Sequence, residues 1–175
     1  MSIIITLQNR YIIKDKQLMK LRFLCANHRL ELQTNMDKAL KFCHTGFDTG
    51  QFYSDRSQWA EAIPHLGCAF EVSDILITHS SIDKEVSCDW LTTSAQLLAH
   101  SLKKAHYSGE SEGVIWMAIN RLEQQLSQNS SQVIWIDRYL GSLYGDLNTR
   151  FTMGSVAAEN SVARVSSSDV AALAH

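Results

Sequence analysis

Residues 89–105 read DWLTTSAQLLAHSLKKA, and this stretch decides what kind of fold the second half of the chain adopts. Asp89 is suited to cap a helix N-terminus, and Lys103 and Lys104 stand where a helix dipole favours cations. Between these ends the apolar residues recur every three or four positions, which is the spacing of one helix face: Leu91, Ala95, Leu98, Leu102 and Ala105. The stretch therefore predicts an amphipathic helix.

Two further helices are predicted after this one. The second begins near Ser111 and buries a stripe made of Ile115, Ala118, Ile119, Leu122 and Leu126. A third stripe follows the turn at 128–131 and consists of Val133, Ile136, Leu140, Leu143, Leu147 and Phe151. A short strand at 133–136 is the alternative, because Val-Ile-Trp-Ile favours β structure. Short connections predict that the three helices pack as antiparallel neighbours.

The first half of the chain predicts a mixture of short elements. Residues 18–25 fit a strand or a helix equally well. We expect a short helix at 35–43, a loop at 44–55, and a second short helix over 55–63 that Pro64 ends. Strands are expected at 3–7, 10–14, 68–72 and 75–78. The predicted fold class is thus α+β and predominantly helical, with a mixed N-terminal half and a C-terminal three-helix antiparallel packing.

Length and composition point to one intracellular domain. The 175 residues are 45% hydrophobic and 19% charged, which is ordinary for a globular chain. We detect no internal repeat, so we expect one domain over 1–152 and a weakly helical or mobile tail over 153–175. No signal peptide or membrane span is evident, and the four cysteines form no C-x-x-C pair. Reduced thiols and a cytoplasmic location follow as expectations.

Catalytic and metal-binding motifs are weak. Asp48-Thr49-Gly50 matches the local signature of aspartic proteases, but a turn stabilised by Asp48 is the preferred interpretation. The pairs Cys25-x-x-His28 and Cys43-His44 offer soft ligands, although their spacing does not suit the common zinc sites. We therefore predict no cofactor, no metal and no catalytic residue. A small cysteine-dependent enzyme remains an alternative.

A self-association surface is the preferred functional hypothesis. Gly141-x-x-x-Gly145 lies within the third predicted helix, where small residues four apart allow close approach of another backbone. Trp135, Tyr139 and Tyr144 flank the two glycines, and such aromatic residues are favoured anchors at interfaces. Packing within the chain is the competing explanation. The sequence thus predicts a non-catalytic protein-binding or regulatory module that forms a homodimer through its C-terminal helices.

Nucleic-acid binding is a second alternative. Residues 1–41 contain eight basic and three acidic side chains, while the whole chain has a net charge of −2. A basic end can bind a partner of opposite charge, nucleic acid among them. The residues that would carry this function are Arg10, Lys14, Lys16, Lys20, Arg22 and Arg29. No membrane partner is expected.

Overall fold

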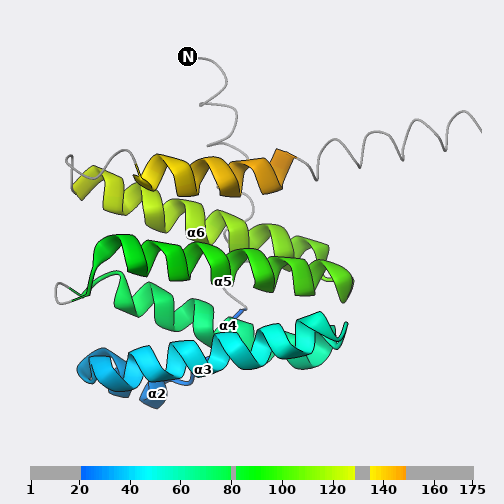
Figure 1. Cartoon of the computed structure of the whole chain (residues 1–175), viewed down its shortest axis with the longest axis horizontal. Coiled ribbons are helices and arrows are strands. Elements are labelled where there is room, and N and C mark those ends of the chain that lie inside the picture. The colour runs from blue at the N-terminus through cyan, green and yellow to red at the C-terminus, as the bar shows by residue number, and fades with distance from the viewer. Residues whose placement is uncertain (1–20, 80–81, 129–134, 149–175) are drawn as a thin grey trace, which may run out of the picture. The chain divides into compact units, whose positions relative to one another are not determined.

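A computed structural model describes residues 21–79, 82–128 and 135–148, and within these ranges every regular element is a helix (Figure 1). The named helices are α2 (Ala26–Thr34), α3 (Met36–Asp55), α4 (Trp59–Leu76), α5 (Lys84–Lys104) and α6 (Ser108–Gln128). Residues 135–148 are also helical. By its contacts the chain divides into two units, Met1–Leu143 and Tyr144–His175. No helix in the described part of the chain is long and apolar enough to cross a membrane.

The predicted strands at 68–72 and 75–78 are wrong, because 68–72 lies wholly in α4 and 75–78 consists of the last two residues of α4 and the turn that follows. This helix packs against α3 on one side and α5 on the other. Most residues from Leu66 to Leu76 are consequently buried, and the stretch lacks the polar face that marks an amphipathic helix. An apolar run without helical periodicity resembles a buried strand, and this explains the error.

The predicted loop at 44–55 is also wrong, since α3 continues through it to Asp55. Gly46 and Gly50 do not mark a turn there. They let α4 approach: a Cβ at Gly50 would lie 2.5 Å from Leu66 Cγ. Pro64 does not end a helix either, because α4 contains it. The carbonyl that would accept from an N–H at position 64 belongs to Ala60, which is exposed, so water can reach it.

The α+β class is therefore corrected to an all-helical arrangement in the described residues. The strands expected at 3–7 and 10–14 lie outside those residues, as do positions 18–20 of the ambiguous segment 18–25. The remainder of that segment, 21–25, is neither strand nor helix and leads directly into α2.

The helices predicted in the second half are confirmed, with changed boundaries. α5 begins at Lys84 instead of near residue 89, and its N-cap is Asp83, whose side chain accepts a hydrogen bond from Val86 N at 3.0 Å. α6 covers the second predicted helix and packs against α5. Residues 135 and 136 are helical, against the strand alternative for 133–136, of which 133 and 134 lie outside the described residues.

Helices α3 and α5 end in two turns of the same type. Ser57 and His106 both adopt positive φ, 60° and 68°, and their positions in the chain differ by 49. At each turn the residue that follows donates its N–H five residues back, from Gln58 to Tyr53 O (2.9 Å) and from Tyr107 to Leu102 O (2.8 Å). This is the Schellman pattern, in which a left-handed residue reverses the chain after a helix.

The same shift of 49 residues relates two pairs of helices, and each of these turns connects the two helices within one pair. α3–α4 and α5–α6 are helical hairpins with equivalent buried positions: Gly50 and Ala99, Ala62 and Ser111, Leu66 and Ile115, Ala69 and Ala118. At the second crossing Ser111 Oγ donates to Ala99 O at 2.6 Å. The described chain therefore contains a structural repeat that we did not detect in the sequence.

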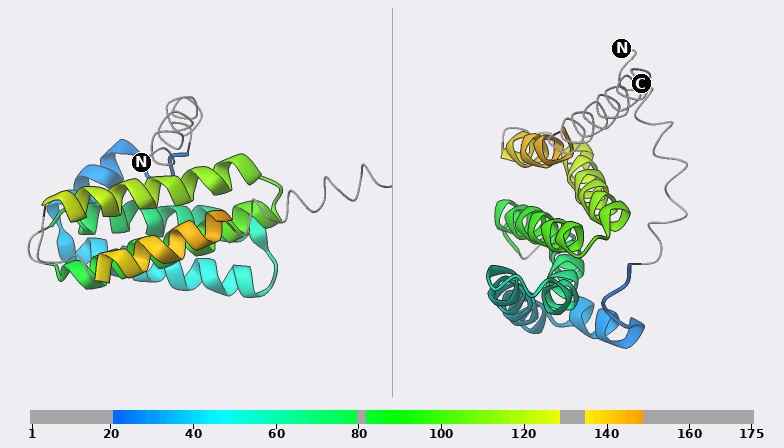
Figure 2. Two further views of the ribbon diagram at one scale, coloured as in Figure 1. Left: turned by 90° about the horizontal axis from the view of Figure 1, so that it is seen from above. Right: turned by 90° about the vertical axis from the view of Figure 1, so that its right-hand side faces the viewer.

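The hairpins stack along the chain. α3 contacts α4, α4 contacts α5 and α5 contacts α6, so each helix mainly meets its neighbours in sequence. Seen end-on in Figure 2, α3 and α5 lie on one side and α4 and α6 on the other. The described residues thus contain two stacked helix pairs, the arrangement that α-solenoids extend over many repeats.

Glycine at the two turns is expected to stabilise the protein. Ser57→Gly and His106→Gly should each raise the free energy of unfolding by about 1 kcal/mol, because a left-handed conformation strains any residue that has a Cβ. Arg56→Gly, at φ −97°, is the matched control and should not stabilise. Urea unfolding followed by circular dichroism measures all three, and no gain at either turn would contradict the strain argument.

Candidate functional site

The predicted interface residues lie on the helix at 135–148. In the first unit, Trp135 is half-buried, Tyr139 is buried, and their rings meet edge to face with centroids 6.3 Å apart. Gly141 is exposed, and a Cβ built there would meet no atom of the described residues within 4 Å. In the second unit, Tyr144 is half-buried and Gly145 is exposed.

Polar contacts to α5 hold residues 135–143 in place. Arg138 Nη2 lies 3.3 Å from Glu85 Oε1, and the same nitrogen donates to Tyr139 Oη at 3.3 Å. Gln96 Nε2 donates to Ser142 Oγ at 2.9 Å. Burial raises the pKa of Tyr139, so its hydroxyl stays protonated and able to donate. Gly141 is thus presented on an anchored helix.

The predicted nucleic-acid residues are only partly visible. Arg10, Lys14, Lys16 and Lys20 lie outside the described residues. Arg22 is exposed, but Arg29 pairs with a carboxylate of the same chain, since its Nη2 lies 2.6 Å from Glu71 Oε2. A guanidinium already bound to a carboxylate is a weaker phosphate contact.

Glu71 is the polar residue that sequence reasoning missed. Its side chain is buried in α4, and its two oxygens accept hydrogen bonds from Phe23 N (2.7 Å) and Leu24 N (3.3 Å) besides Arg29. A buried carboxylate needs such partners, because desolvation of an unpaired charge is costly. The sequence did contain a signal for this residue, because Glu71 is a single acidic side chain inside the apolar run 68–72.

A second group of side chains that we did not predict joins the first helices of the two hairpins. The indole of Trp90 on α5 contacts two rings of α3, His44 at a centroid distance of 4.4 Å and Phe47 at 5.3 Å. Trp90 and Phe47 are half-buried and pack against the buried hydrophobic cluster that contains Cys43 and Ala69, whereas His44 is exposed. The cluster connects one hairpin to the next.

The cysteines do not assemble a metal site in the described part of the chain, where no three His, Cys, Asp or Glu side chains cluster. Cys25 Sγ lies 3.3 Å from His28 Nδ1 at the surface, but Cys43 is buried while the adjacent His44 is exposed. Burial raises the pKa of Cys43 to about 11 and that of Cys88 to about 12. Such thiols carry little thiolate at neutral pH, which disfavours either as a nucleophile.

The described residues form two stacked helical hairpins, with residues 135–143 held against α5 and residues 21–25 held by Glu71. No family model, no curated protein and no solved structure matches the chain.

Proposed function

We propose that the chain is a cytoplasmic, non-catalytic protein-binding module that self-associates through the helix at 135–148. The observation that carries this proposal is the exposure of Gly141 on a helix anchored to α5 by Arg138 and Ser142. A glycine within a helix costs about 1 kcal/mol relative to alanine. If a second backbone packs closely against an exposed glycine that has no described neighbour, the packing offsets this loss of helix stability.

The architecture is compatible with this role. Stacked helical hairpins expose long faces, and proteins built this way use those faces to bind other molecules. Trp135 is half-buried and lies within two turns of Gly141, and aromatic side chains supply much of the binding energy at interfaces, whereas Tyr139 is buried within the first unit. A regulatory role would follow if the partner changes the oligomeric state.

Self-association should depend on the size of residue 141. We expect sedimentation velocity to show a concentration-dependent dimer for the wild-type chain and at least about a tenfold weaker dimer for Gly141→Leu, because a leucine side chain prevents close backbone approach. Gly109→Leu is the matched control, since Gly109 is an exposed helical glycine that also lacks described neighbours within 4 Å. A wild-type monomer at all concentrations, or equal weakening by both variants, contradicts the proposal.

A further inference from the structure

The outer surface of α4 holds the segment 21–25 as a binding site holds a peptide. We call Gly67, Cys68 and Glu71 the α4 seat. The ring of Phe23 lies directly over Gly67, where an added Cβ would come within 2.2 Å of Phe23 Cγ. Beside it, Cys68 Sγ donates to Phe23 O at 3.7 Å. Residues 21–25 are not helical, so their backbone N–H groups need partners outside the segment.

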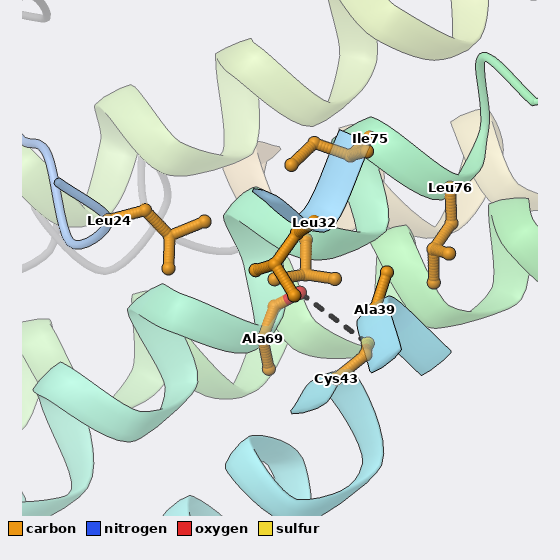
Figure 3. Close-up of a cluster of buried hydrophobic side chains, with 8 residues drawn as sticks. Leu24, Leu32, Ala39, Cys43, Ala69, Ile75 and Leu76 are labelled. Atoms are coloured by element: carbon orange, nitrogen blue, oxygen red, sulfur yellow. Dashed lines mark hydrogen bonds between the residues drawn. The ribbon is translucent and has the colours of Figure 1, made fainter. Parts of the chain in front are cut away.

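The α4 seat recognises a particular chemistry. Glu71 accepts hydrogen bonds from two consecutive backbone N–H groups, which requires a bent backbone such as the bend at Leu24, because successive N–H groups of an extended strand point to opposite sides. Gly67 leaves a recess for an aromatic ring. The next residue, Leu24, is buried in the hydrophobic cluster that also contains Leu32 and Ala69 (Figure 3). The seat therefore fits a bent, non-helical segment with an aromatic residue followed by an aliphatic one.

The α4 seat is not a requirement of the hairpin architecture. At the equivalent positions of α6, 49 residues later, Trp116 replaces Gly67 and Asn120 replaces Glu71. The second hairpin thus carries a large side chain where the first leaves space for a ring from elsewhere. The seat is a special feature of α4.

The segment 21–25 is held by the α4 seat and by burial of Leu24, but the helix that follows it adds little packing of its own. The segment continues into α2, a helix of 9 residues with one buried residue, Leu32, and no side-chain hydrogen bond at its N-cap. Leu30 of the same helix is 64% exposed. Short helices open more easily than long ones, so we expect residues 21–34 to open before the hairpins do, with loss of the three hydrogen bonds to Glu71 and of the burial of Leu24 and Leu32.

We propose that the α4 seat is an interaction site for a bent, non-helical partner segment carrying an aromatic–aliphatic pair, and that residues 21–25 occupy it until the partner displaces them. The inference deepens the protein-binding function but does not depend on the dimer. Competition with an intramolecular segment lowers the apparent affinity by the fraction of molecules in which the seat is open.

The test uses the full-length chain and a fluorescent peptide of residues 20–34 in which Cys25 is replaced by serine. By fluorescence anisotropy, the peptide should bind Phe23→Ala protein at least about tenfold more tightly than wild type, because the weakened segment vacates the seat. A peptide with alanine at the position of Phe23 should bind neither protein.

Two further variants in the Phe23→Ala background identify the site. Gly67→Trp copies the second hairpin and should abolish binding, and Glu71→Gln should weaken it by about tenfold through loss of the charge-assisted hydrogen bonds. Circular dichroism verifies that each variant is folded, and Gly141→Leu should leave peptide binding unchanged. Equal peptide affinity for wild-type and Phe23→Ala protein, or no binding to folded Phe23→Ala protein, shows a purely structural segment and overturns the proposal.

Discussion

Leu66→Ala should lower the free energy of unfolding by about 2–5 kcal/mol, the usual cost of removing a fully buried leucine. Leu66 has 0% of its surface exposed and packs where α3 crosses α4, against the backbone of Gly50. Because Gly50 has no side chain that could move into the space, the cavity cannot collapse easily. Urea unfolding followed by far-ultraviolet circular dichroism measures the change.

A double-mutant cycle with Gly50 checks that the crossing itself is responsible. Gly50→Ala should destabilise by about 1–3 kcal/mol, since the new Cβ would lie 2.5 Å from Leu66 Cγ and 3.1 Å from Leu66 N. Leu66→Ala removes the side-chain clash, so the double variant should lose less than the two single losses added together. Gly141→Ala, at an exposed helical glycine, should stabilise by up to about 1 kcal/mol. Strict additivity would contradict the proposed contact.

The helices with one buried face were predictable, and the helix between two neighbours was not. α5 and α6 keep polar residues on one side, so their apolar positions recur at helical spacing. α4 meets α3 and α5, and residues that would be polar on a surface helix are apolar or small in it. Its periodicity is lost for a physical reason, and only the contacts with both neighbours show that it is a helix.

The hairpin repeat escaped detection because equivalent positions conserve size and burial rather than residue type. Gly50 corresponds to Ala99, Ala62 to Ser111 and Leu66 to Ile115. The turns are equally disguised, since serine and histidine occupy positions where glycine is usual. When two different residue types adopt the same backbone conformation, a comparison of residue types along the sequence cannot detect it.

The α4 seat depends on residues that are distant in sequence, and this limits what a motif search can find. Phe23 and Gly67 are individually unremarkable, and their contact is created by the path of the chain. Glu71 gave a local hint as a charge in an apolar run. Its partners, two backbone N–H groups of residues 23 and 24 and the side chain of Arg29, have no sequence signature.

Alkaline pH should destabilise the protein through its two buried thiols. Burial raises the pKa of Cys43 from 9.0 to about 11 and that of Cys88 from 9.0 to about 12. Above about pH 9 the unfolded chain loses these protons while the folded chain retains them, so the unfolded state gains stability as the pH rises. Each thiol therefore lowers the free energy of unfolding by about 1.4 kcal/mol per pH unit until its folded pKa is reached.

Both thiols together should remove up to about 5 kcal/mol between about pH 9 and pH 11, measured under reducing conditions by thermal and urea unfolding. Lysine and tyrosine also titrate in this range, so the decisive comparison is between wild type and Cys88→Ala. Cys88 is fully buried, and its removal should make the slope against pH shallower by about 1.4 kcal/mol per unit. If wild type and Cys88→Ala show the same slope, the buried thiol near the N-terminal end of α5 does not resist ionisation as its surroundings require.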